Sequence, residues 1–365
     1  MPTPSAALKA FAGCLFLIGI ALGMRGTDVS RARSPESSPQ AGTQPLITQA
    51  LRGIWTDNGG QIWVVGDFGL ILHSSDGGAT WERQPSGIES RPYAVRFLRN
   101  GSQAWIVGEF GLLLNSPDGG KTWKRRASGT TNDLHSVFGT SDGSRLWLVG
   151  AYGLVLHSSD GGETWHVQPT PTRSLLESIS GDQDGRRLWV VGEFGLILYS
   201  PDGGKSWQYQ EGGTKNHLYS VFCSRDGSRV WLVADWGLIL HTTDAGKSWK
   251  PQPNQSGNLY SICGAKDGDL LWAAGAHRSI VHSSDSGKNW KAHLTDNPTD
   301  LYSICASGDG KLVWAVGDFG LILHSTDGGE HWEKQDLVLR RRPEPTFLLS
   351  RETMCVFFRS FLPMA

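Results

Sequence analysis

The chain has few cysteines, almost no net charge and no apolar run long enough to cross a bilayer comfortably. Its five cysteines among 365 residues are scattered, which excludes the dense disulfide framework of small secreted domains. Its 34 basic and 35 acidic side chains leave a formal net charge of −1. Because nucleic acids and anionic membranes attract strongly basic surfaces, the charge balance gives no support for nucleic-acid binding.

Several catalytic signatures are also missing. The chain has no nucleophile elbow, no phosphate-binding loop and no cluster of residues at metal-ligand spacing. The arginine motif of sialidases, of the F/Y-R-I-P type, is absent as well. The sequence therefore predicts no catalytic residue, no cofactor and no metal.

The N-terminus contains Lys9 and then an apolar stretch at residues 10–22. This stretch is short for a membrane-spanning helix, which needs about 20 residues, and a small-x-small cleavage pattern follows at residues 21–23. Residues 1–24 are predicted to be a signal peptide, with an uncleaved anchor as the alternative. Residues 25–48 are rich in Ser and Pro and predict a disordered linker. We expect an exported protein, in a periplasm, a lumen or outside the cell.

A turn motif, S-x-D-x-G-x-T-W or a close variant, recurs seven times. Its aspartates are spaced 42 residues apart, with one step of 41: Asp76, Asp118, Asp160, Asp202, Asp244, Asp285 and Asp327. A tryptophan precedes each aspartate by 13 residues, at Trp63, Trp105, Trp147, Trp189, Trp231, Trp272 and Trp314. A period in the forties with short apolar runs and many glycines is typical of four-stranded propeller blades. The chain is therefore predicted to be all-β, a seven-bladed β-propeller of four-stranded antiparallel blades over residues 49–338.

Residues 133–168 show how one repeat forms one blade, because four short apolar or alternating runs are separated by turn signals. We name the strands A to D, with A lining the central channel and D following the motif tryptophan. The last repeat supplies its own strand D after Trp332. We therefore expect the ring to close by side-chain packing between blades 1 and 7, without strand exchange. Residues 339–365 have no repeat features, and their structure is not predicted.

The motif aspartates have a structural explanation. In a tight turn, an aspartate accepts hydrogen bonds from backbone N–H groups one or two residues further on, and the later glycine permits positive φ. The tryptophan then buries its ring against neighbouring strands. Histidines directly precede the motif at His73, His157, His241, His282 and His324, where we expect spacers or hydrogen-bonding residues. For the cysteines we expect buried free thiols, with a disulfide or a reactive site as the alternative.

The motif resembles the Asp-box, or bacterial neuraminidase repeat. Combined with VGDFGLILHSSDGGATW and VGEFGLILYSPDGGKSW, it resembles the propeller of the photosystem II stability and assembly factor family, over residues 49–338. The resemblance implies an extracytoplasmic, non-catalytic scaffold that binds protein partners, including segments of membrane proteins. We expect a monomer.

The B–C turns supply the candidate binding residues, because most of them carry an acid followed by an aromatic residue. The candidates are Asp67, Phe68, Glu109, Phe110, Tyr152, Glu193, Phe194, Asp235, Trp236, Arg278, Asp318 and Phe319. Arg278 replaces the glycine of the other blades, and such asymmetry suits a specific site. The predicted ring of carboxylates and aromatics suits basic or amphipathic protein segments. The alternative is that the aromatics fill gaps between blades and the acids satisfy turn backbone.

A second hypothesis is a glycan-binding protein or a sialidase-like glycoside hydrolase. Such enzymes use two carboxylates about 5 to 9.5 Å apart, which acids of adjacent blades could provide. However, five near-equivalent acids are typical of repeat inheritance and not of a tuned acid and base.

Overall fold

The computed structural model describes residues 47–340, apart from residues 59, 99–100, 253–255, 278 and 295–298. The predicted signal peptide, most of the predicted linker, Arg278 and residues 341–365 lie outside the described residues. Among the helices of the described part, none is long and apolar enough to cross a membrane.

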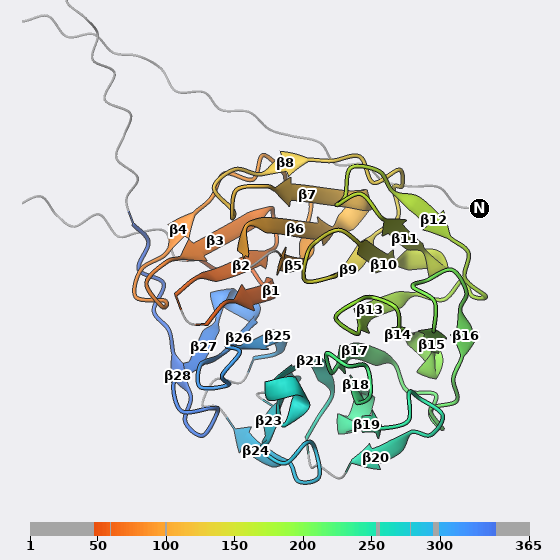
Figure 1. The fold of residues 1–365 in the computed structure, drawn as a ribbon. Coiled ribbons are helices and arrows are strands. Elements are labelled where there is room, and N and C mark those ends of the chain that lie inside the picture. Colours follow the sequence, from red (N-terminus) through yellow and green to blue (C-terminus); the bar gives the residue numbers. More distant parts are fainter. Residues whose placement is uncertain are drawn as a thin grey trace, which may run out of the picture. The chain divides into compact units, whose positions relative to one another are not determined.

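Seven four-stranded antiparallel sheets are arranged in a ring, and each sheet uses four consecutive strands (Figure 1). The predicted seven-bladed propeller is confirmed. The strands of blades 1 to 3 are β1 (Leu51–Thr56), β2 (Ile62–Gly66), β3 (Leu70–Ser74) and β4 (Glu82–Arg83); β5 (Pro92–Leu98), β6 (Gln103–Gly108), β7 (Leu112–Ser116) and β8 (Lys124–Arg125); and β9 (Leu134–Gly139), β10 (Leu146–Gly150), β11 (Val155–Ser158) and β12 (His166–Gln168).

Blades 4 to 7 repeat the same order. Their strands are β13 (Leu176–Gly181), β14 (Leu188–Gly192), β15 (Ile197–Ser200) and β16 (Gln208–Tyr209); β17 (Leu218–Cys223), β18 (Val230–Ala234), β19 (Ile239–Thr242) and β20 (Lys250–Gln252); β21 (Leu259–Ala265), β22 (Leu270–Gly275), β23 (Ser279–Ser283) and β24 (Lys291–Leu294); and β25 (Leu301–Ala306), β26 (Val313–Gly317), β27 (Ile322–Ser325) and β28 (Glu333–Lys334). Short 3-10 turns are η2 (Glu109–Gly111), η3 (Ala151–Gly153), η4 (Glu193–Gly195), η5 (Asp235–Gly237), η6 (Lys266–Gly268) and η7 (Asp318–Gly320).

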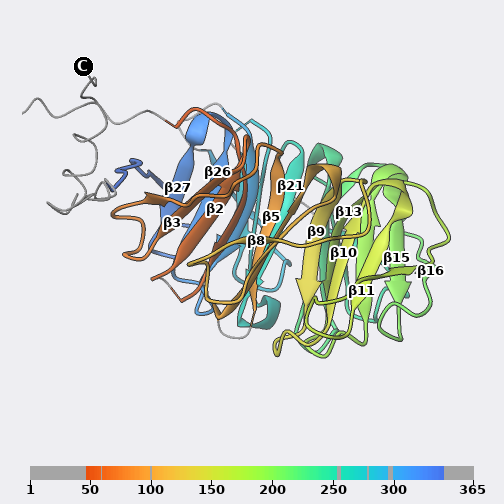
Figure 2. The ribbon, with the colours of Figure 1, turned by 90° about the horizontal axis from the view of Figure 1, so that it is seen from above.

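Strand B is buried along all or nearly all of its length in each blade because neighbouring blades cover both of its faces. In blade 3, β10 is buried at every position from Leu146 to Gly150, whereas the outer strand β12 is mostly exposed. A strand buried on both faces reads as a continuous apolar run, which is the sequence pattern of RLWLVG. Figure 2 shows strands of neighbouring blades lying side by side around the ring.

The two repeated sequence markers meet between neighbouring blades. The indole of Trp63 in blade 1 lies against Gly120 in the motif turn of blade 2, so closely that a Cβ on Gly120 would lie 2.2 Å from Trp63 Cζ2. In the same way, Trp105 faces Gly162, and Trp147 donates a hydrogen bond to the carbonyl of Gly203 at 3.2 Å. Blade 7 and blade 1 are joined likewise, because Gly78 lies against Trp314. We call this contact the tryptophan–glycine joint.

The inner strands are also linked around the channel by serine hydroxyls. In blades 3 to 7, a Ser Oγ accepts a hydrogen bond from a backbone N–H of the next inner strand, at 3.2 to 3.4 Å: Ser136 from Ile179, Ser178 from Val221, Ser220 from Ile262, Ser261 from Ile304 and Ser303 from Ile54. Blades 1 and 2 have Gly53 and Ala94 at this position. The link from Ser303 to Ile54 helps to close the ring.

Ring closure agrees with the prediction in one respect and corrects it in another. No strand is exchanged, because β25 to β28 form blade 7 and β1 to β4 form blade 1. Closure does not rest on side-chain packing alone, however. The chain after β28 pairs in parallel with the outer edge of blade 1, where Trp81 donates to Val338 at 2.9 Å and accepts from Arg340 at 2.8 Å. Leu339 and Arg340 fall in the segment for which the sequence predicted no structure.

Candidate binding face

The B–C turns lie on one face of the ring together with the D–A connections. In blade 3, the Gly153 N–H donates to the Ser174 carbonyl of the next connection at 2.8 Å. The motif turns lie on the opposite face with the A–B turns, as the bond from the Gly161 N–H to the Ser144 carbonyl shows. We call the first face the B–C face. It contains every described candidate binding residue of the sequence analysis.

The aromatic residues of this face point into solvent. Their exposed fractions range from 69% to 84%: Phe68, Phe110, Tyr152, Phe194, Trp236 and Phe319. The alternative that these aromatics fill gaps between blades is therefore wrong. They make up six of the nine large hydrophobic residues that are exposed in the described part of the chain.

Each of the six aromatics also adopts a left-handed backbone conformation, with φ between 55° and 59°. Residues other than glycine and asparagine seldom do so, because Cβ approaches the carbonyl oxygen. Neighbouring groups hold the turn in place. The Phe110 N–H donates to Asp133 Oδ1 at 2.8 Å, and the Trp236 N–H donates to Asn258 Oδ1 at 2.8 Å. The following glycine leaves no room for a side chain, since a Cβ on Gly111 would lie 2.0 Å from the Thr130 carbonyl.

The acids of the B–C turns are engaged within the protein. Asp67 pairs with Arg52 at 3.0 Å and with Arg91 at 2.8 Å. Glu109 accepts from the Arg91 N–H at 3.1 Å, and Glu193 accepts from the Leu175 N–H at 3.0 Å. The alternative reading of the acids, that they satisfy turn backbone, therefore holds for these two.

The remaining two acids are also engaged, one with a backbone N–H and both with a tyrosine hydroxyl. Asp235 accepts from the His217 N–H at 3.1 Å and from the Tyr219 hydroxyl at 2.9 Å. Asp318 accepts from the Tyr302 hydroxyl at 3.1 Å. The carboxylates thus position the turns, and the aromatic rings are what the face presents to a partner.

A polar and aromatic collar surrounds the channel at this face, and the sequence analysis missed it. It consists of the second residue of each inner strand: Arg52, Tyr93, His135, Glu177, Tyr219, Tyr260 and Tyr302. Neighbouring members touch, since Tyr93 stacks on His135 at 4.8 Å and Arg52 lies over the Tyr302 ring at 4.4 Å. The signal that could have found the collar is the large or charged residue that directly follows the first apolar residue of every strand A.

Glu177 joins two histidines across three blades. Its Oε2 lies 3.0 Å from His135 Nδ1, and its Oε1 lies 2.9 Å from His217 Nε2. Burial alone raises the pKa of Glu177, but the hydrogen bonds from the two imidazoles outweigh it and lower the pKa to about 2. The hydrogen bond to Glu177 in turn raises the pKa of His217. The charged forms of Glu177 and His217 are therefore favoured in the folded protein.

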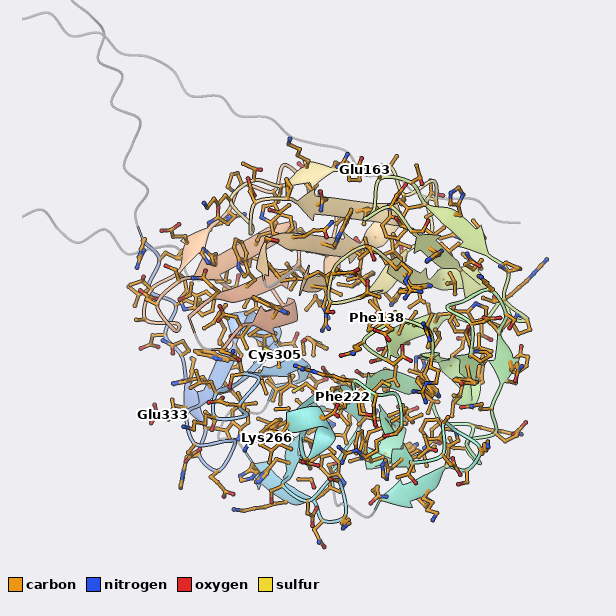
Figure 3. The ribbon with its side chains drawn as sticks, in the orientation of Figure 1. Phe138, Glu163, Phe222, Lys266, Cys305 and Glu333 are labelled. Atoms are coloured by element: carbon orange, nitrogen blue, oxygen red, sulfur yellow. The ribbon has the colours of Figure 1, made fainter. Side chains whose placement is uncertain are left out.

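The channel itself has a volume of about 1140 Å³ and is lined by the inner strands. Figure 3 labels Phe138, Phe222 and Cys305 close to its centre. Lys266 lies on η6, in the A–B turn of blade 6, and therefore on the face opposite the B–C face. Cys223, Cys263 and Cys305 are free thiols, as expected, but only Cys223 is buried, and desolvation raises the pKa of all three.

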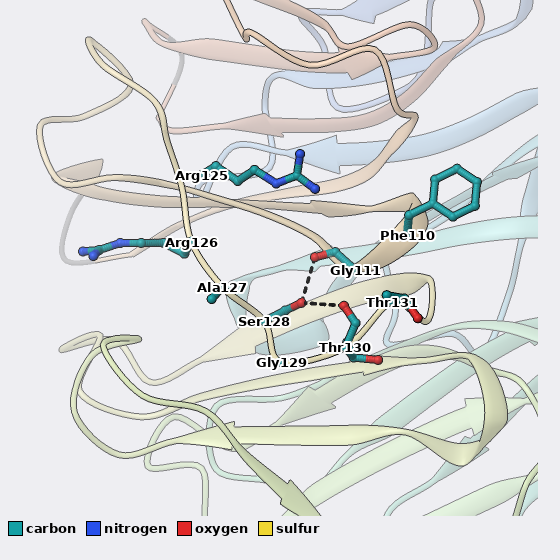
Figure 4. A pocket seen from close by; sticks show the side chains of 9 residues that line it. All are labelled: Phe110, Gly111, Arg125, Arg126, Ala127, Ser128, Gly129, Thr130 and Thr131. Carbon is teal, nitrogen blue, oxygen red and sulfur yellow. Dashed lines mark hydrogen bonds between the residues drawn. The ribbon is translucent and has the colours of Figure 1, made fainter.

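A shallow pocket of about 650 Å³ lies beside one of the exposed aromatics (Figure 4). Phe110 borders it on one side, and residues 125–131 of the connection to blade 3 border it on the other. Ser128 Oγ fixes the floor by donating to the Gly111 carbonyl at 2.8 Å. Arg126 points away to Glu163 at 2.9 Å, while Arg125 extends over the pocket.

Four of the five recurring histidines stack on the tryptophan of strand B, whereas His282 stacks on His293. Ring centroids are 4.0 Å apart for Trp63 and His73 and 4.6 Å apart for Trp231 and His241. Burial lowers the pKa of His241 to about 4, so this imidazole is neutral at pH 7. In the described part of the chain, no group of three or more His, Cys, Asp or Glu side chains is placed to hold a metal ion.

The motif aspartates close their turns with a longer reach than we predicted. Asp118 Oδ1 accepts from the N–H of Thr122, four residues on, at 2.9 Å, and Oδ2 accepts from the Thr122 hydroxyl at 2.7 Å. Ser116 Oγ donates to Asp118 and accepts from the Gly120 N–H at 2.7 Å. Desolvation raises the pKa of Asp118, but these bonds lower it to about 2. We expected Asp118 to bind N–H groups one or two residues further on. Longer bonds replace them, because the turn reaches from Ser116 before the aspartate to Thr122 after it.

Three segments of the sequence, residues 85–173, 165–256 and 257–355, match the family described as Photosynthesis system II assembly factor YCF48. The chain belongs to this family. No curated protein matches it.

Solved structures of the family share its fold. YCF48 from Cyanidioschyzon merolae is 22% identical, with a TM-score of 0.64 over 77% of this chain and 97% of that one. A structure of YCF48 bound to D1 peptide is 20% identical, with a TM-score of 0.63 over 77% of this chain and 94% of that one. The GH74 xyloglucanase of Xanthomonas campestris also matches at a TM-score of 0.63, but with 14% identity and over 55% of its length.

Proposed function

We propose that this member of the family is a non-catalytic, exported scaffold that holds a protein partner on its B–C face. The observation that carries the proposal is the ring of six exposed aromatics in left-handed turns. Exposed aromatic side chains with rigid backbones are the residues that dominate binding energy in protein interfaces. A likeness to YCF48, of which one structure holds a D1 peptide, supports a peptide segment as the bound element.

The engaged acids refine the chemistry of the partner. Since Asp67 and Glu109 are already paired with arginine, the face offers little free negative charge. We therefore favour an apolar or amphipathic segment, such as a membrane protein exposes during assembly, over a basic one.

The test is a binding titration of a triple variant that combines Phe110→Asn, Phe194→Asn and Trp236→Asn. Asparagine tolerates the left-handed conformation, so the turns keep their shape while the rings are lost. Binding of D1 peptide, followed by fluorescence anisotropy, is expected to weaken about tenfold or more. The control Val167→Asn removes an equally exposed apolar side chain on β12, outside the face, and should change nothing. Equal affinity of the triple variant and the wild type would contradict the proposal.

The glycoside hydrolase hypothesis is compatible with the fold shared with the GH74 enzyme, but the five acids of the described B–C turns are all engaged within the protein. We expect no turnover of sialosides, xyloglucan or other β-glucans. If the wild type turns over one of these substrates and both Asp67→Ala and Asp235→Ala lose this activity, the scaffold hypothesis is wrong and the protein is an enzyme.

A further inference from the structure

The chain's own C-terminal segment shows how the outer edge of a blade binds an added strand. Residues 337–340 run parallel to the edge of blade 1 and bond to both main-chain groups of Trp81. Leu337 and Leu339 pack against the apolar cluster that contains Trp81, while Val338 between them is exposed. Side chains therefore alternate between the blade and solvent, as in a strand added to a sheet.

An arginine completes this contact. Arg340 lies 2.8 Å from Asp76 Oδ2 and 3.4 Å from Glu82 Oε1. The blade edge thus contributes three features: free main-chain groups, the tryptophan ring and two carboxylates. With the segment in place, Trp81 has no exposed surface.

Only one other blade carries both carboxylates. The residue after the motif tryptophan is Lys124, His166, Gln208, Lys250 and Lys291 in blades 2 to 6, and Glu333 in blade 7. A lysine at this position repels an incoming arginine and is a common protection of exposed sheet edges. Blade 7 instead repeats blade 1, with Asp327, Trp332 and Glu333 for Asp76, Trp81 and Glu82.

The edge of blade 7 is accessible. Figure 3 labels Glu333 at the outer rim of the ring, and this carboxylate makes no ion pair with any described residue. The Trp332 N–H and carbonyl likewise make no hydrogen bond within the described part of the chain, and its ring is partly exposed. Asp327 Oδ2 accepts from His331 Nδ1 at 2.6 Å, just as Asp76 Oδ2 accepts from the Thr80 hydroxyl at 2.6 Å while still binding Arg340. That bond therefore leaves room for a guanidinium.

We propose that the outer edge of blade 7 is a second docking site, which binds an extended segment of a partner protein as an added parallel strand. The segment has the chemistry of residues 337–340: two aliphatic side chains separated by one residue, followed directly by arginine. The site lies on the rim and not on the B–C face, so it is independent of the proposed function.

The probe is a fluorescent peptide with the sequence of residues 335–340, Gln-Asp-Leu-Val-Leu-Arg, titrated against the full chain at pH 8. We expect saturable binding of one peptide per chain. Glu333→Lys should weaken binding about tenfold, because a charge-assisted hydrogen bond is replaced by repulsion. Methylation of the backbone N–H of the peptide's arginine should weaken binding by a similar factor, because this N–H corresponds to the one that Arg340 donates to the Trp81 carbonyl. Lysine occupies the same place in three other blades, so the variant is expected to fold.

Two further variants locate the site. Gln208→Lys places the same side chain on the edge of blade 4 and should leave binding unchanged. Glu82→Lys lies on blade 1, where the chain's own segment is bound. Loss of binding in Glu82→Lys but not in Glu333→Lys would mean that the peptide displaces that segment, and would overturn the proposal. No saturable binding, or equal binding to Glu333→Lys, would overturn it as well.

Discussion

Six aromatic side chains occupy backbone positions that steric rules assign to glycine or asparagine. Each sits at φ between 55° and 59°, and the connection to the next blade binds the N–H groups of Phe110 and Trp236. Strain of this kind persists only where surrounding bonds over-determine the conformation, and it gathers at functional sites. The acid–aromatic pattern was visible in the sequence. Its orientation was not, because a one-dimensional pattern does not distinguish an aromatic that fills a gap from one that points into solvent.

Replacing one of these aromatics should stabilise the protein. Phe194 is 76% exposed, so little packing is lost in Phe194→Asn. Relief of the left-handed conformation should raise the free energy of unfolding by about 1 kcal/mol. Urea denaturation of both proteins measures the difference. A variant less stable than the wild type would show that the ring contributes packing and that the strain argument fails.

Glu177 should make stability depend on pH in a defined window. Its pKa is lowered from the usual 4.5 to about 2, so its contribution is present above pH 4.5 and disappears as the pH falls toward 2. The pKa of His217 is raised, so its contribution is complete below pH 6.5 and disappears as the pH rises through its folded value. Glu177→Gln is therefore expected to cost most, about 2 kcal/mol, between pH 4.5 and 6.5.

Thermal unfolding of wild type and Glu177→Gln across this pH range measures the profile. The control is Glu163→Gln, whose carboxylate is 64% exposed and pairs only at the surface with Arg126. If Glu177→Gln loses the same stability at every pH, the ionisation of Glu177 and of its two histidine partners does not contribute to folding.

Six of the seven contacts between neighbouring blades use the tryptophan–glycine joint, and at the seventh Gln210 lies against Gly246. The spacing of the two markers predicted that both belong to every repeat, and the turn chemistry predicted positive φ at the glycine, which the structure confirms. The sequence did not predict that the strand-B tryptophan of one blade packs against the motif glycine of the next blade. Their separation of 57 residues between Trp63 and Gly120 is longer than one repeat, so the contact exists only once blades are stacked.

Gly120→Ala should test this joint. An added Cβ would lie 2.2 Å from Trp63 Cζ2, in a region where neither backbone nor indole can yield easily. We expect a loss of about 3 kcal/mol in unfolding free energy. Gly129→Ala is the matched control, because Gly129 also has positive φ, 75°, but open space around its Cα. Similar losses in both variants would assign the cost to backbone conformation and not to the joint.

The complete ring is closed by contacts that join the two ends of the described chain. The number of blades and the absence of strand exchange followed from counting markers. The pairing of residues 338–340 with Trp81 did not, because nothing in an irregular segment after the last repeat indicates which distant edge it reaches. Arg340 and Asp76 are 264 residues apart.

Arg340→Ala should weaken this closure slightly. Arg340 is 45% exposed, and exposed ion pairs contribute little, so we expect a loss of about 0.5 to 1 kcal/mol. Differential scanning calorimetry is the measurement, with Lys334→Ala on the nearby strand β28 as control. Insensitivity to Arg340→Ala would show that the ion pairs of Arg340 contribute nothing to closure and that the other contacts between blades 7 and 1 suffice.

Trp314 packs against Gly78 as five other strand-B tryptophans pack against a glycine of the following turn, and this gives the array no terminal repeat. In a linear solenoid the outermost unit has one neighbour, so fraying begins there and spreads inward. A closed wheel has no such starting point. Unfolding any one blade breaks its joints to both neighbours at once, and the seven units should therefore melt together, as a single cooperative transition.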